Sequence, residues 1–96
     1  MQSKQGAFLL LEFDETKRQK VLEKNGIDLL DAAQILDGPV LVAASDRNGE
    51  IRWLAIGLLN GLEIALAFTR RGENIRLISA RRARENERRA YHARFP

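Results

Sequence analysis

IRLISARRARENERRAY, residues 75–91, begins with the pattern of a strand and ends with that of a helix. Ile75, Leu77 and Ser79 alternate with the residues between them, which is the period of two expected of a half-buried strand. From Arg81 onward the composition shifts to Arg, Ala, Glu and Asn, most of which favour a helix. We therefore expect a strand over residues 75–80 and a helix that starts near Arg81.

The same region carries an excess of positive charge. Residues 70–96 hold nine Arg and three Glu, a net charge of +6, whereas residues 1–69 hold seven Lys or Arg and ten Asp or Glu, a net charge of −3. A basic third on a mildly acidic body indicates a polyanion or an acidic protein as partner.

Length and composition indicate one domain over residues 1–96, with residues 1–6 flexible. The sequence has no Cys and one His, which excludes disulfides and cysteine sites and makes a zinc site improbable, so no cofactor or metal is expected. The absence of Cys suits a cytoplasmic location. The apolar run 54–68 is too short for a membrane span and is interrupted by Asn60-Gly61 and Glu63.

Upstream of the opening stretch, the sequence predicts a short strand and two helices. The apolar residues 7–13 favour a strand. Asp14 is suited to cap a helix over residues 15–24, which Asn25-Gly26 would end. This helix has a narrow apolar stripe and should lie on the surface. Asp28 is suited to cap a second helix over residues 29–36.

Three further strands are predicted between these helices and residue 75, over residues 40–44, 51–59 and 62–69. Asn60-Gly61 is the strongest hairpin signal in the chain, because both central positions of a type I′ turn need positive φ. The order of elements predicts an α+β fold. Its sheet has four to five mainly antiparallel strands, with two N-terminal helices and a C-terminal helix packed on one face.

Several motifs resemble those of the BrnT family of bacterial type II toxins. They are FDETK (13–17), NGI (25–27), AAQILDGP (32–39), TRR (69–71), IRLISARRA (75–83), and Glu87-Arg88 with Tyr91. The resemblance implies a RelE-like fold and a metal-independent endoribonuclease that inhibits translation, with ribosome-associated mRNA as one possible substrate. It also implies a BrnA-like antitoxin as partner, through which alone the toxin would contact DNA, and no association with membranes.

The N-terminal motif departs from the family pattern, which is W-D-x-x-K-x-x-x-N followed by His-Gly. Asp14 and Lys17 match it, but Phe13 replaces the Trp, Val21 the Asn and Asn25 the His. A histidine is the usual proton-transfer group near neutral pH. The alternative function is therefore a catalytically impaired module of the same fold that binds RNA or the antitoxin.

RNA cleavage without a metal needs a base, an acid and cations that stabilise the phosphate. Arginine suits the last task because its planar fork binds two phosphate oxygens at once. Arg76, on a predicted strand, and Arg81, at its junction with the helix, are the first candidates. Arg52 and Arg71 fall where the family pattern carries Arg, and Lys17 could bind phosphate or donate a proton.

Glu87 and Tyr91 complete the candidate set, and each has an ordinary structural alternative. Glu87 could pair with a nearby Arg, and Tyr91 could pack its ring on the sheet. Arg76 could likewise lie in solvent or pair with Glu63 across the sheet. His92 and Ser79 are not expected to be catalytic, and Trp53 is expected in the core.

Overall fold

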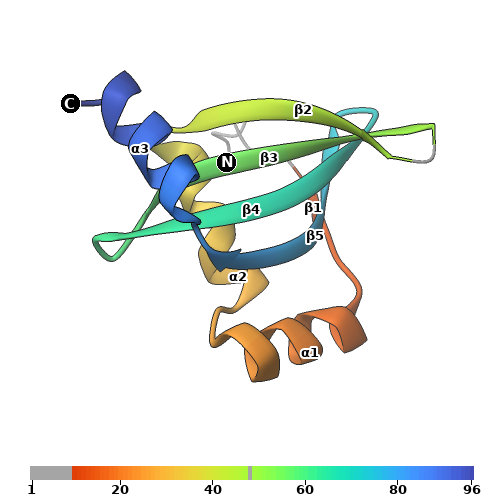
Figure 1. The fold of residues 1–96 in the computed structure, drawn as a ribbon. Coiled ribbons are helices and arrows are strands. Elements are labelled where there is room, and N and C mark those ends of the chain that lie inside the picture. Colours follow the sequence, from red (N-terminus) through yellow and green to blue (C-terminus); the bar gives the residue numbers. More distant parts are fainter. Residues whose placement is uncertain (1–9, 48) are drawn as a thin grey trace, which may run out of the picture.

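The computed structural model describes residues 10–47 and 49–96 and contains a five-stranded sheet, three α-helices and a 3₁₀ helix (Figure 1). The sheet order is β1-β5-β4-β3-β2. β1 pairs with β5 in parallel, and the other neighbouring strands are antiparallel. In chain order the elements are β1 (Leu11–Glu12), α1 (Glu15–Asn25), α2 (Leu29–Ala32), η1 (Ala33–Asp37), β2 (Leu41–Arg47), β3 (Glu50–Leu59), β4 (Leu62–Arg71), β5 (Asn74–Arg82) and α3 (Glu85–Arg94).

Helices cover both faces of the sheet, so the prediction that all of them pack on one face is wrong. α1, α2 and η1 lie on one face, where Leu29 and Ile35 pack against Leu66 and Leu77 in the main core. α3 lies on the other face, where Tyr91 packs against Ala65 in a smaller cluster. Residues of β4 alternate between the two clusters, because successive side chains of a strand point to opposite faces.

The N-terminal helices follow the sequence prediction closely. α1 begins after Asp14, whose side chain accepts hydrogen bonds from the backbone N–H groups of Thr16 and Lys17, and ends at Gly26, which has a φ of 72°. The predicted second helix 29–36 is divided into α2 and η1, with Asp28 as its cap. The predicted first strand is reduced to Leu11–Glu12, and the part of it over residues 7–9 lies outside the described residues, as do residues 1–6.

The end of the sheet differs from the prediction at two points. β5 continues to Arg82 and α3 begins only at Glu85, so the helix does not start near Arg81. The register also shifts between Phe68, which pairs with Leu77, and Ala67, which pairs with Ser79. This bulge breaks the predicted alternation, because an extra residue in one strand reverses the faces that follow it.

Two glycines fix the packing of the hairpins and helices. Asn60 and Gly61 form the predicted turn with φ angles of 52° and 83°. At Gly57 in β3, an added Cβ would lie 2.8 Å from the Cβ of Ile35 in η1, so only glycine allows η1 to approach the sheet this closely.

None of the described helices has the length and apolar character needed to span a membrane.

Candidate nucleic-acid interface

A groove of about 440 Å³ lies on the α3 face of the sheet. Four strands and the first turn of α3 form it, and its lining residues are Ser45, Arg52, Trp53, Leu54, Ala65, Ala67, Ile78, Ser79, Arg81, Arg84 and Glu87. Three of these residues are Arg and one is Glu. The groove therefore combines positive charge with a concave surface.

Small side chains on the strands make this face hollow. Leu54, Ala67 and Ser79 are paired neighbours in one row across β3, β4 and β5. Arg81 pairs with Ala65, two residues along β4 from Ala67, and Arg52 lies two residues along β3 from Leu54 in the opposite direction. At the usual rise of a strand, Arg52 and Arg81 are offset by about 13 Å along the strand direction and lie two strands apart, with Leu54, Ala67 and Ser79 between them.

Arg81 forms the tightest ion pair in the groove. Its Nη1 and Nη2 donate to the two carboxylate oxygens of Glu87 at 2.8 and 2.9 Å. The same carboxylate accepts a hydrogen bond of 2.7 Å from the backbone N–H of Arg84, next to the start of α3. The hydrogen bonds from Arg81 outweigh the effect of burial and lower the pKa of Glu87 from 4.5 to about 2.

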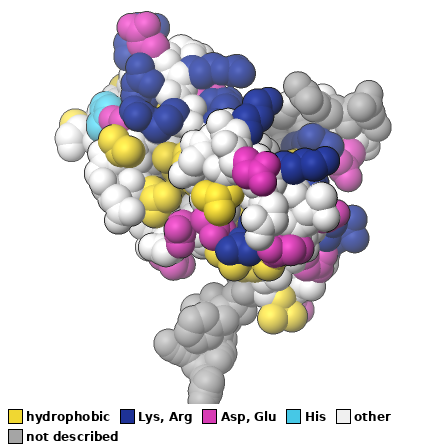
Figure 2. Space-filling view, turned by 90° about the horizontal axis from the view of Figure 1, so that it is seen from below, with side chains coloured by type: hydrophobic (Ala, Val, Ile, Leu, Met, Phe, Trp, Pro, Cys, Tyr) yellow, Lys and Arg dark blue, Asp and Glu magenta, His cyan; other side chains and the backbone are white. Residues whose placement is uncertain are grey.

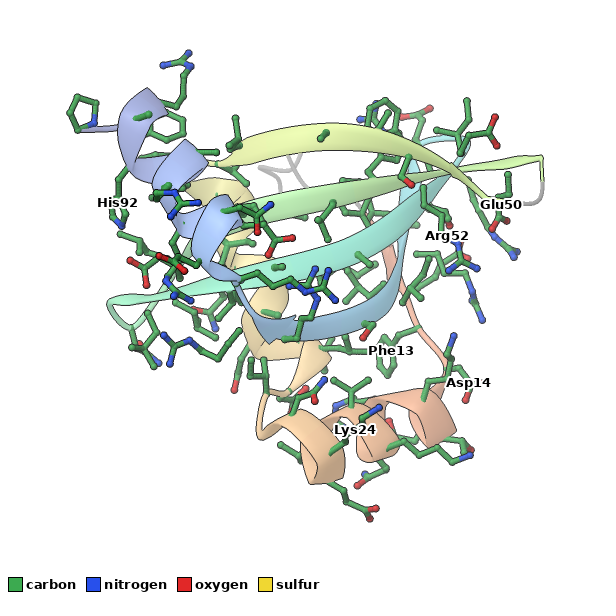
Figure 3. All side chains as sticks on the ribbon, in the orientation of Figure 1. Phe13, Asp14, Lys24, Glu50, Arg52 and His92 are labelled. Carbon is green, nitrogen blue, oxygen red and sulfur yellow. The ribbon has the colours of Figure 1, made fainter. Side chains whose placement is uncertain are left out.

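Arg52 and Arg84 complete the positive charge of the groove. The Nε of Arg52 lies 3.3 Å from Oε1 of Glu50, two residues before it on β3, and the Arg52 side chain is 37% exposed (Figure 3). Arg84 is exposed and, among the described residues, forms no salt bridge. Arg84 is not among the predicted catalytic residues, but it is the last Arg of the RRAR run at residues 81–84, a pattern that favours a solvated face or an RNA groove over a catalytic centre.

Arg71 and Arg76 lie beside the groove without lining it. Arg76 shares the groove's face of the sheet, but its Nη1 lies 3.7 Å from Oε1 of Glu12. The Nε of Arg71 lies 4.0 Å from the same oxygen, and Asn74 donates to the other oxygen at 2.8 Å. The suggested pairing of Arg76 with Glu63 is therefore wrong, because the parallel pairing of β1 with β5 places Glu12 next to Arg76.

The other two candidates, Lys17 and Tyr91, lie away from the groove, as does His92, which is not expected to be catalytic. Lys17 is exposed on α1, which packs on the opposite face. Tyr91 is 2% exposed, and its hydroxyl donates to the carbonyl of Pro39 at 3.0 Å. His92 is exposed 2.6 Å from a carboxylate oxygen of Glu63, at the other end of the sheet from Arg52 (Figure 3).

The position where the BrnT pattern has a histidine also lies outside the groove. Asn25 ends α1, and its Nδ2 donates to the carbonyl of Ala80 at 2.9 Å. Together with Asp31 and Arg82 it borders a second hollow of about 310 Å³ on the α1 and α2 side of the sheet. Val21 packs against the main core on the same side.

The chemistry available in the groove is therefore cationic. Its guanidinium groups can bind phosphate oxygens and stabilise the negative charge of the pentacoordinate phosphorus species that forms during cleavage. Its carboxylate, Glu87, is fully ionised at neutral pH and is a weak base, because its pKa is about 2. No group of three or more His, Asp or Glu residues suited to a metal ion occurs in the described parts of the chain.

Figure 2 shows how the charged side chains are distributed on the underside of the molecule. Lys and Arg side chains gather along the upper edge of this view, whereas the centre mixes acidic, basic and hydrophobic side chains. The excess of Arg that the sequence shows in residues 70–96 belongs largely to β5 and α3.

Comparisons with known proteins agree with this picture. A sequence model of the family described as "Ribonuclease toxin, BrnT, of type II toxin-antitoxin system" matches residues 13–87. Among solved structures, the chain is similar to the Brucella abortus ribonuclease toxin BrnT, with 30% sequence identity and a TM-score of 0.67 over 81% of this chain and 100% of that chain. No curated protein sequence matches this chain.

Proposed function

Because this chain belongs to the BrnT family of ribonuclease toxins of type II toxin–antitoxin systems, we propose that it is a metal-independent endoribonuclease whose site is the Arg-lined groove. Three guanidinium groups, those of Arg52, Arg81 and Arg84, line one concave surface, and this observation carries the proposal. Cleavage of RNA in the cytoplasm would inhibit translation. A BrnA-like antitoxin would hold the toxin inactive, and the sheet and helices would form a RelE-like domain.

In the proposed reaction the groove binds the phosphate at the cleavage site. Arg81, fixed by Glu87, and Arg84, exposed at the start of α3, bind its oxygens and stabilise the charge that develops when the neighbouring 2′-hydroxyl attacks the phosphorus and the bond to the 5′-oxygen breaks. Water takes the proton of the 2′-hydroxyl and supplies one to the leaving 5′-oxygen. Arg52 binds the backbone further along the strand. Arg76 and Arg71 lie next to this path, where Glu12 partly neutralises them.

The proposal can be tested with the purified chain and a single-stranded RNA substrate in EDTA. We expect cleavage to persist in EDTA, and Arg81→Ala and Arg84→Ala to lower the rate by on the order of 100-fold, as removal of one donor to a developing oxyanion does. Arg76→Ala should have a smaller effect because Arg76 is turned towards Glu12.

A matched control removes an exposed positive charge outside the groove. Arg70, at the far end of β4, provides it, and Arg70→Ala should leave the rate unchanged. Loss of cleavage in EDTA would contradict the metal-independent mechanism. A full rate in the Arg81 and Arg84 variants would contradict the assignment of the groove.

One observation favours the alternative, a binding module without catalysis. The groove contains no histidine, and its carboxylate has a pKa of about 2, so none of its described lining side chains is suited to take the proton from the 2′-hydroxyl at neutral pH. If the chain produces neither RNA cleavage nor growth arrest when expressed without a partner, this alternative is supported. Asn25→His should not increase cleavage in the groove, because Asn25 lies on the opposite side of the sheet.

A further inference from the structure

The hydrogen bonds of Arg81 leave one edge of its guanidinium group open. A guanidinium group has five N–H donors. Nη1 donates to Glu87 at 2.8 Å and to the carbonyl of Arg82 at 3.2 Å, and Nη2 donates to Glu87 at 2.9 Å. Among the described residues, no partner is found for the Nε hydrogen or for the second hydrogen of Nη2. These two donors point the same way and form the side-on fork that fits two phosphate oxygens.

Glu87 is itself held by a second element. It belongs to the first turn of α3, and its Oε1 accepts the backbone N–H of Arg84 at 2.7 Å in addition to the bond from Arg81. The Glu87 side chain is 14% exposed and that of Arg81 is 30% exposed, so the pair is largely shielded from solvent. The carboxylate therefore fixes a side chain of β5 relative to the start of α3.

We propose that Glu87 is a positioning residue. It binds the end of the Arg81 guanidinium group formed by Nη1 and Nη2, so that the side-on edge, formed by Nε and Nη2, is presented to a phosphate of the RNA. This inference rests on the proposed ribonuclease function and assigns roles within it. Arg81 contacts the substrate and Glu87 does not. Glu87 is ionised throughout the neutral range because its pKa is about 2, and it keeps Arg81 in place without exchanging a proton.

A double-mutant cycle separates this role from two others that Glu87 could have. If Glu87 acts through Arg81, Glu87→Gln should lower kcat by about 10- to 100-fold, as a small misplacement of a catalytic group does. It should have no further effect in an Arg81→Ala background. If Glu87 acted directly as the base, the substitution would lower kcat in both backgrounds. If Glu87 served only to stabilise the start of α3, the substitution would lower the Tm without lowering the kcat of the folded fraction.

The Michaelis constant gives a second distinction. Glu87→Gln removes a negative charge from the groove, so the affinity for RNA should not fall even though the guanidinium group loses its orientation. We therefore expect KM within about threefold of the parent value while kcat falls. Glu85→Gln, which removes a carboxylate from the same turn of α3 outside the groove, is the matched control and should change neither constant. An unchanged or increased kcat in Glu87→Gln would overturn the proposal.

An NMR measurement tests the inference even if the parent chain does not cleave RNA. Binding of both Nη atoms to one carboxylate hinders rotation of the guanidinium group, so the Nη hydrogens of Arg81 should give resolved signals in the parent. These signals should be lost in Glu87→Gln and retained in Glu85→Gln. In the parent, an uncleavable 2′-O-methyl RNA oligonucleotide should shift the Arg81 Nε signal. No resolved Nη signals, or no Nε shift on saturation, would reject the role of Glu87 independently of catalysis.

Discussion

All four candidate arginines have a carboxylate partner, but the pairs differ in geometry. Arg81 and Glu87 form two short bonds, whereas Arg52 lies 3.3 Å from Glu50 and Arg76 lies 3.7 Å from Glu12 through single contacts. Exposed single contacts are worth about 0–1 kcal/mol, so a phosphate can displace them at little cost. Arg81 is thus the fixed cation of the groove and Arg52 an adaptable one, and Arg76 is an adaptable cation beside the groove.

The same pair should make stability depend on pH. The pKa of Glu87 is lowered from 4.5 to about 2, so folding favours its ionised form. This contribution is complete above about pH 4.5 and is lost as the pH falls towards 2. We expect Glu87→Gln to reduce the free energy of unfolding at pH 7 by on the order of 2 kcal/mol, after allowance for partial exposure, and by progressively less below pH 4.5.

Urea denaturation of the parent and Glu87→Gln over this pH range measures the difference. Glu85 and Arg89 form an exposed i,i+4 pair on the same helix, so Glu85→Gln provides a control that should show little change at any pH. A difference between parent and Glu87→Gln that stays constant down to pH 2 would mean that the carboxylate is not stabilised by Arg81.

At the scale of the elements, patterns confined to one segment were predictable from the sequence and pairings between distant segments were not. Asp14 and Gly26 bound α1, and Asn60-Gly61 joins β3 to β4, because caps and turns depend on neighbouring residues. The bulge in β5 and the contact of Glu12 with Arg76 depend on strand pairing, and no local pattern encodes them.

The candidate site was predictable to the same extent. The run of Arg in residues 76–84 indicated a basic surface, but which of its members share the groove depends on the bulge and on the start of α3 at Glu85. Arg81 and Arg84 line the groove, whereas Arg76 does not. Arg76 lies on the same face but next to Glu12, and no local pattern encodes the pairing of β1 with β5 that brings Glu12 there.

The contact of η1 with β3 gives a prediction at this scale. Gly57→Ala would place a Cβ 2.8 Å from Cβ of Ile35, which cannot rotate away, so η1 or the strand must move. We expect the free energy of unfolding to fall by about 1–3 kcal/mol, as for other overpacked core substitutions. Gly38→Ala is the control, because a Cβ there meets no atom within 4 Å and its φ is −120°. Equal stability of the two variants would contradict the close approach.

At the scale of the whole molecule, folding separates the two ends of the chain. The N-terminal segments form α1, α2 and η1 on one face, and the basic C-terminal third forms β5 and α3, which border the groove on the other (Figure 1). Two of the nine Arg of this third, Arg81 and Arg84, thus join Arg52 at the groove. Such a distribution orients an approaching polyanion towards the groove.

This arrangement predicts how RNA binding depends on salt. Each phosphate that a protein neutralises on a single strand contributes about −0.7 to the slope of log K against log salt concentration, so Arg52, Arg81 and Arg84 together predict a slope of about −2. Fluorescence anisotropy of an uncleavable 2′-O-methyl RNA oligonucleotide between about 50 and 200 mM salt measures it. Arg84→Ala should reduce the magnitude of the slope by about 0.7, because it removes one phosphate contact. Arg70→Ala removes the same charge outside the groove and should leave the slope unchanged. Equal slopes in the two variants would mean that net charge, and not the groove, determines binding.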